Sequence, residues 1–210
     1  MQSNSFHESL LRIKNDYLYQ ILSIPIHINI CAGTGCIANG ALKVYDEFQK
    51  QLANSNINVV LTMSEGHHKH PENSALLMKS GCHGFCQMGS LVEISPMDVL
   101  YTKVKPEDVS RIIEKTIKNR TIIDDLLYIN NIGEIFEKSS DIPFYSLQTR
   151  NTLEKCGAID ATDIKAYIAQ DGYLSATNTF TQMIPQDVIN IITRSGLRGR
   201  GGAGFPTGKK

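Results

Sequence analysis

Four cysteines in two short glycine-rich segments are the residues of this chain best suited to chemistry. Cys31 and Cys36 are separated by Ala-Gly-Thr-Gly, and Cys82 and Cys86 by His-Gly-Phe. Two segments that each offer two thiolates can together hold one metal centre. The glycines remove Cβ atoms where backbone must wrap closely around a cluster and turn its N–H groups toward sulfur. The pattern favours an iron–sulfur electron-transfer site.

Other states of four cysteines stay open on spacing alone. A [2Fe–2S] cluster has two tetrahedral irons, each completed by two protein thiolates, so two pairs match its needs without remainder. Structural zinc also takes four cysteines at spacings of this kind, and four buried thiols need no metal at all. A thiol–disulfide enzyme would use C-x-x-C, which the sequence lacks.

Composition excludes several classes of protein. The 21 basic and 21 acidic residues cancel and form no long run of one sign, which argues against a nucleic-acid partner. No apolar stretch approaches the roughly 20 residues that span a bilayer, so we expect no membrane span. The first residues lack the order of a signal peptide, and five cysteines are too few for a disulfide scaffold. We therefore expect a cytoplasmic protein.

The elements around the cysteines are those of a compact α/β domain. We expect strands at 26–30, 57–63 and 74–79, a helix at 40–53, a hairpin at 91–104 and a helix from Pro106. Both cysteine segments follow predicted strands. We therefore expect them at one end of the sheet, where open α/β sheets usually place their sites.

The whole chain divides into four expected segments. These are a helical N-terminal extension (1–25), the cysteine-containing domain (26–120), a linker (121–145) and the start of a second domain (146–210). The linker is assigned because no periodic pattern occurs there. Helical patterns return at 149–156, 160–170 and 185–195, with Asp160 as the expected N-cap of the middle helix.

The C-terminal residues 195–210, SGLRGRGGAGFPTGKK, are a second candidate binding segment. Five glycines in positions 199–208, between arginines and lysines, are typical of a loop that binds phosphate through its backbone amides. From composition alone, a flexible glycine-rich tail is an equal alternative.

The cysteine spacing and the order of elements resemble the thioredoxin-like [2Fe–2S] domain of the small flavoprotein-fraction subunit of respiratory complex I. The resemblance covers about residues 26–118. It implies that Cys31, Cys36, Cys82 and Cys86 bind a [2Fe–2S] cluster.

The C-terminal segment resembles the FMN-binding loop of the NADH-oxidising flavoprotein subunit of complex I. The pattern G-R-G-G-x-G-F-x-x-G-x-K matches residues 199–210 without a break. The residues that this resemblance implies for FMN binding are Gly199, Arg200, Gly201, Gly202, Gly204 and Lys210. A chain that carries both the cysteine-containing domain and the glycine-rich C-terminal segment is similar to the β-subunit of soluble NAD(P)-linked [FeFe]-hydrogenases and formate dehydrogenases.

The resemblance implies an α/β fold, with a thioredoxin-like ferredoxin domain followed by a helical segment leading into a truncated FMN-binding domain. In the family the NADH pocket, most of the FMN pocket and a [4Fe–4S] site lie beyond this loop, so we expect them only in a longer protein. The resemblance further implies that NADH gives a hydride to FMN and that the cluster transfers single electrons. It implies a multi-subunit complex of hydrogenase, formate dehydrogenase or quinone reductase type. A stand-alone ferredoxin and a zinc-binding interaction module are the alternatives.

The remaining candidates have ordinary explanations. His67, His68 and His70 lie in a polar segment and are expected to be solvated. His83, between two cysteines, is expected to shape its loop, and Cys156 to be a small buried residue in a helix.

Overall fold

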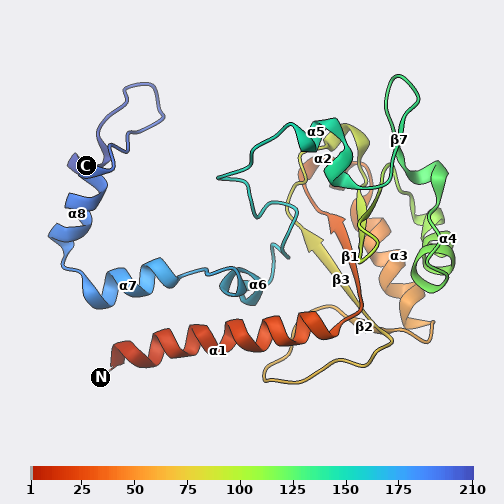
Figure 1. The fold of residues 1–210 in the computed structure, drawn as a ribbon, viewed down its shortest axis with the longest axis horizontal. Coiled ribbons are helices and arrows are strands. Elements are labelled where there is room, and N and C mark those ends of the chain that lie inside the picture. Colours follow the sequence, from red (N-terminus) through yellow and green to blue (C-terminus); the bar gives the residue numbers. More distant parts are fainter. Residues whose placement is uncertain (1) are drawn as a thin grey trace.

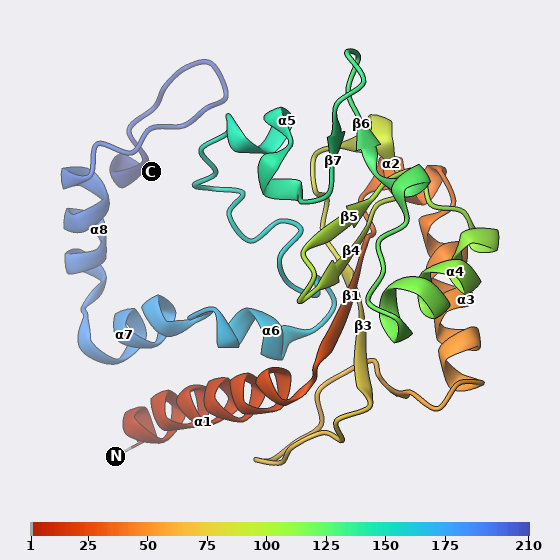
Figure 2. The same cartoon turned by 45° about the vertical axis from the view of Figure 1, so that its right-hand side comes forward.

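A five-stranded sheet is the centre of the computed structural model, which describes residues 2–210, with side chains from Phe6 onward. Its strand order is β2-β3-β1-β4-β5, with β2 labelled in Figure 1 and β4 and β5 labelled in Figure 2. The strands are β1 (Ile26–Cys31), β2 (Asn58–Val60), β3 (Ser74–Ser80), β4 (Val92–Ser95) and β5 (Val99–Tyr101). The expected strands and hairpin are therefore present, although β2 and β5 are shorter than predicted.

The register of β1 and β3 positions the two cysteine segments. These strands run parallel, with Ile26 opposite Ala75 and Cys31 opposite Ser80. Their carboxyl ends are therefore level, and the loops that follow leave the same end of the sheet. This agrees with the placement expected from sequence.

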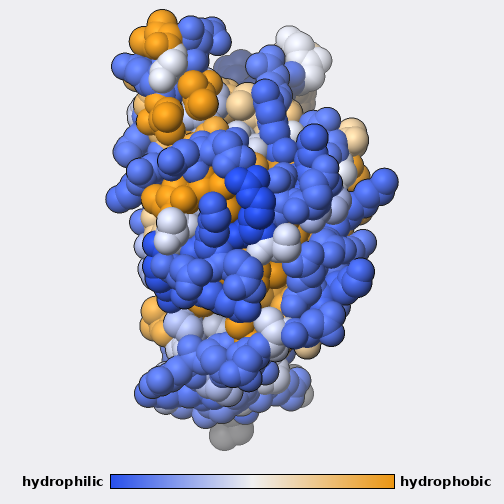
Figure 3. Space-filling model, turned by 90° about the vertical axis from the view of Figure 1, so that its right-hand side faces the viewer, coloured by the Kyte–Doolittle hydropathy of each residue, from blue (hydrophilic) through white to orange (hydrophobic). Residues whose placement is uncertain are grey.

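Two sets of helices complete the main core. In α3 (Ala41–Ala53), Val44, Phe48 and Leu52 are fully buried. The helical turns that begin at Pro106 comprise η2 (Pro106–Asp108), α4 (Val109–Arg111) and the π-helical η3 (Ile112–Lys118). They contact α3, so both sets lie on the same side of the sheet. Figure 3 shows this side of the molecule as largely hydrophilic, with its hydrophobic side chains in separate patches.

A second, smaller core lies between the N-terminal helix and a distant part of the chain. The predicted helix is present as α1 (Gln2–Ser23), and it packs against α6 (Ile164–Ala169). Tyr17 of α1 is buried together with Leu76 of β3 and Ala166 of α6. The N-terminal helix therefore holds α6, which lies beyond the sheet and its helices in the sequence.

Residues 121–145, expected to be an irregular linker, pack against the edge strand β5. They include the short hairpin of β6 (Tyr128–Ile129) and β7 (Ile135–Phe136), and single bridges join the segment to β5. Ile123, Leu126 and Ile142 are buried in the main core. Strands of two residues are too short to produce a recognisable period, which explains why sequence showed no element here.

The C-terminal part contains α5 (Pro143–Ser146), α7 (Leu174–Gln182) and α8 (Pro185–Arg194). Figures 1 and 2 show α7 and α8 extending away from the sheet. The helix expected at 185–195 is present, but the one expected at 149–156 is absent, because that stretch forms successive turns. The N-cap of α6 is Asp163, whose side chain accepts from Lys165 N. Asp160 instead closes a local turn by accepting from Thr162 N.

Across residues 2–210, no helix combines the length and apolar character that crossing a membrane requires.

Candidate metal centre

The first cysteine pair is delivered by a strand and a short helix. Cys31 is the last residue of β1, and Cys36 lies in α2 (Thr34–Ala38), a helix that sequence reasoning missed. Both side chains are buried, each with 1% of its surface exposed. A helix of this length, with a glycine inside it, has no periodic pattern by which to be recognised.

The second pair lies in the loop after β3. Cys82 follows the strand by two residues, and Cys86 begins the single turn η1 (Cys86–Met88). Both thiols are exposed, in contrast to the first pair. The site therefore has a buried half and an open half.

Glycines allow the two loops to interlock. A Cβ added to Gly33 would lie 2.8 Å from Cys82 Cβ, and one added to Gly35 would lie 3.0 Å from Cys86 Cβ. A Cβ at Gly89 would lie 2.8 Å from the sulfur of Cys36. Real Cβ atoms essentially never come closer than 3.0 Å to such atoms, so a side chain at Gly33 or Gly89 would force a shift, and one at Gly35 would be tight. The structure thus brings all four predicted cysteines together.

Backbone N–H groups point at the sulfurs. His83 N lies 3.5 Å from Cys31 Sγ, and Gly84 N lies 3.3 Å from Cys82 Sγ. Cys82 Sγ and Cys86 Sγ are 3.7 Å apart. Amide donors of this kind stabilise negative charge on sulfur.

Hydrogen bonding between the thiols changes the pKa of three of the cysteines. The hydrogen bond from Cys36, which outweighs the effect of burial, lowers the pKa of Cys31 to about 6. That same bond raises the pKa of Cys36. Contact with Cys82 likewise raises the pKa of Cys86. Metal binding would release the thiol protons, because thiolates are the ligands.

These features fit a [2Fe–2S] cluster. Such a cluster needs four thiolates in two pairs, close backbone and amide donors to sulfur, and all three are present. Within residues 2–210, no three Cys, His, Asp or Glu side chains converge as the ligands of a single ion would.

His83 fixes the second loop to the sheet. Its ring is buried, and Nε2 lies 2.8 Å from Ser80 Oγ at the end of β3. Burial, with a smaller contribution from Arg150, lowers the pKa of His83 to about 4, so the imidazole is neutral at physiological pH. Gly157 packs directly against the ring. These contacts agree with the loop-shaping role predicted for His83.

Residues 150–157, here called the covering segment, lie over this loop although they are far from it in the sequence. Arg150 Nη2 donates to the carbonyl oxygen of His83 at 2.8 Å, and buried Asn29 Nδ2 donates to Gly157 O at 2.7 Å. Sequence reasoning missed Arg150, because a lone arginine in a stretch expected to be helical carries no distinguishing signal.

Aromatic rings shield one side of the second loop. Phe85, between the two cysteines, stacks on Phe144 with ring centroids 4.7 Å apart. Tyr128 and Tyr145 contact the ring of Phe85 edge-on, with ring centroids 5.1 and 5.7 Å from its centroid. This packing fixes the Phe85 side of the loop against residues 128–145.

The glycine-rich segment near the C-terminus forms a closed loop away from the cysteines. Gly199 N donates to Phe205 O at 2.9 Å, and Arg198 and Pro206 form an isolated antiparallel β-bridge. The loop follows α8 and lies across the molecule from the sheet in Figures 1 and 2. The two predicted binding segments are therefore not brought together.

The other residues singled out from sequence do not join the site. His67 stacks on Tyr19 with centroids 3.7 Å apart, and His70 Nε2 lies 3.3 Å from Gln20 Oε1. Cys156 is half-buried, and it lies in a turn rather than in the helix expected for it.

A profile of the thioredoxin-like [2Fe–2S] ferredoxin family matches residues 23–117, which include all four paired cysteines. This part of the chain is a thioredoxin-like [2Fe–2S] ferredoxin domain. The α/β fold class expected from the sequence is thereby confirmed, as is the expected electron-transfer role of the domain.

Three relatives illustrate where such sequences occur. The NADP-reducing hydrogenase subunit HndC of Solidesulfovibrio fructosivorans is 51% identical over 63 residues, which are 30% of this chain and 13% of that protein. A subunit of the NADH-quinone oxidoreductase of Buchnera aphidicola is 57% identical over 47 residues, 22% of this chain and 11% of that one. A 2Fe-2S ferredoxin of Aquifex aeolicus is 37% identical over 54 residues, which are 26% of this chain and 49% of that protein. The chain thus spans a small part of the two enzyme subunits.

Proposed function

We propose that the four cysteines hold one [2Fe–2S] cluster, with Cys31 and Cys36 on one iron and Cys82 and Cys86 on the other. The interlocking of the two loops at Gly33 carries this proposal, because it places both pairs side by side. When bound, the cluster accepts and releases one electron at a time.

The chain's own residues would set the conditions for that transfer. Cys31 on β1 and Cys36 on α2 are buried, so water is excluded from their half of the site. The amides of His83 and Gly84 would offset negative charge on sulfur. Because Cys82 and Cys86 are exposed, we propose that electrons enter and leave at their edge of the domain.

We further propose that this chain is the electron-transfer part of an NADH-oxidising flavoprotein subunit. The two enzyme subunits similar to it, one of an NADP-reducing hydrogenase and one of an NADH-quinone oxidoreductase, support this. On this proposal residues 146–210 begin an FMN-binding domain. The proposed partners are the other subunits of a cytoplasmic redox complex.

The glycine-rich loop supports the FMN part of the proposal. Gly202 and Gly204 adopt positive φ values of 95° and 57°, which glycine tolerates best. Space is open where their Cβ atoms would stand, which leaves room for a phosphate to approach the backbone there. Arg200 and Lys210 are exposed and would supply positive charge, and the amide of Gly201 would supply a donor. The amide of Gly199 is already bonded to Phe205 O, so Gly199 would contribute by closing the loop.

Serine substitution at each of the four cysteines tests the ligand assignment. Iron and sulfide are assayed after anaerobic reconstitution, with Cys156→Ser as the matched control. We expect each of the four variants to lose cluster or to change its EPR spectrum, and the control to match wild type. Full retention of an unchanged cluster in any of the four would contradict the assignment.

A further inference from the structure

One peptide group links a positive charge to a cysteine sulfur. The carbonyl of His83 accepts a hydrogen bond from Arg150 Nη2 at 2.8 Å. The N–H on the other side of that same peptide belongs to Gly84 and donates to Cys82 Sγ at 3.3 Å. The guanidinium and the sulfur are therefore joined through a single amide.

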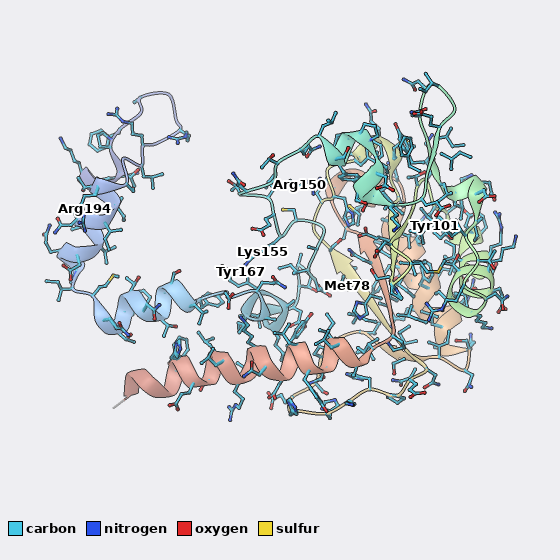
Figure 4. The ribbon with its side chains drawn as sticks, in the orientation of Figure 1. Met78, Tyr101, Arg150, Lys155, Tyr167 and Arg194 are labelled. Carbon is cyan, nitrogen blue, oxygen red and sulfur yellow. The ribbon has the colours of Figure 1, made fainter. Side chains whose placement is uncertain are left out.

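Arg150 is held in this position by its surroundings. Its guanidinium lies over the ring of Tyr145, 5.2 Å from the centroid, and Nε donates to Gln148 Oε1 at 3.4 Å. Nη2 also stands 3.5 Å from the place where a Cβ on Gly84 would be. Figure 4 shows Arg150 on the loop between α5 and α6. The contact is thus part of the packed structure over the cysteine loop.

A cation at the carbonyl end of an amide strengthens its N–H as a donor, because linked hydrogen bonds polarise one another. A bond from that N–H to sulfur stabilises negative charge. Reduction adds one negative charge to a cluster already surrounded by four thiolates. The hydrogen bond to sulfur therefore stabilises the reduced cluster more than the oxidised cluster.

We propose that Arg150 raises the reduction potential of the cluster by polarising the His83–Gly84 peptide. This inference rests on the proposed cluster at the four cysteines. Arg150 lies beyond residues 23–117, the part that matches the ferredoxin family. The potential of the ferredoxin domain is therefore set in part by the segment that leads toward the flavin side of the chain.

Redox titrations of Arg150→Gln and Arg194→Gln test the proposal. Both changes remove one positive charge, but Arg194 lies on α8, far from Arg150 in Figure 4. We expect Arg150→Gln to lower the equilibrium constant for reduction about tenfold, which is ~59 mV for a one-electron couple. Arg150→Lys keeps the positive charge but lacks the planar guanidinium, so its midpoint potential should fall by less than that of Arg150→Gln. Arg194→Gln should match wild type.

Iron and sulfide are assayed on every protein, which separates this inference from the proposed function. Absence of a cluster in wild type would contradict the proposed function itself. With the cluster present, an unchanged midpoint in Arg150→Gln, or an equal shift in Arg194→Gln, would overturn the role of Arg150. If Arg150→Gln does not retain cluster, Arg150→Lys decides, and a midpoint equal to that of wild type overturns the proposal.

Discussion

Substituting Gly33 with alanine tests whether the interlocking of the two loops is required. The backbone of Gly33 has φ −66° and ψ 154°, an extended conformation that alanine adopts freely. The substitution therefore adds a steric contact without backbone strain. Its new Cβ would lie 2.8 Å from Cys82 Cβ and 3.0 Å from both Cα and Sγ of Cys82.

The size of the effect follows from these distances. Carbon atoms in contact normally lie about 3.5–4.0 Å apart, so the second loop must recede by about 0.7 Å or more. Two of the three clashing atoms are close to the backbone, so a change of side-chain rotamer cannot relieve them. Overpacking of this kind costs about 1–3 kcal/mol. It would also separate Cys82 from the first pair.

Gly81→Ala is the matched control. Gly81 is next to Cys82, it is not among the glycines with positive φ, and a Cβ there would meet only Gly157 N at 4.0 Å. Alanine at such a position should be neutral or stabilise by roughly 0.4–1 kcal/mol, because it restricts the unfolded chain. Urea unfolding of the metal-free proteins and iron content after reconstitution are measured for both variants.

We expect Gly33→Ala to unfold at lower urea concentration and to bind less iron than Gly81→Ala. If Gly33→Ala matched the control in both the unfolding midpoint and the iron content, the interlocking of the loops would not be what assembles the site.

Three further changes have defined outcomes. Burial raises the pKa of Glu93, so this residue favours the folded state while protonated, and that stability is lost as pH rises through its folded-state pKa. Glu93→Gln should therefore raise Tm at neutral pH and flatten the dependence of Tm on pH, and an unchanged profile in thermal denaturation would refute this. Asn29→Ala removes the buried bond to Gly157 O and should cost about 1–3 kcal/mol in urea unfolding, whereas wild-type stability would mean that the covering segment is held elsewhere. Phe144→Ala removes the ring stacked on Phe85, so visible absorbance should decay faster in air, and equal decay would show that the ring gives no shielding.

The strands and cysteine loops could be predicted because their signals are local. β1 and β3 are short apolar runs, and glycines next to cysteines indicate close backbone approach. The interlocking itself, in which Gly33 faces Cys82 and Gly35 faces Cys86, depends on the parallel register of β1 and β3. Sequence predicted the strands but not that register.

The covering segment could not be predicted, because tertiary contacts override its local pattern. The stretch 149–156 is expected from sequence to be a helix, yet turns run from residue 152 to residue 158, with Gly157 at φ 84°. Arg150, just before these turns, donates to a carbonyl 67 residues earlier in the chain. A contact between a side chain and distant backbone leaves no periodic trace in either segment.

Iron and sulfide analysis with visible and EPR spectra of the anaerobically purified protein tests the central claim most directly. Two irons and two sulfides per chain should be found, with absorbance that bleaches on dithionite reduction as the EPR signal of a reduced [2Fe–2S] cluster develops. A colourless protein with one zinc and no sulfide would contradict the claim that Cys31, Cys36, Cys82 and Cys86 form an electron-transfer site.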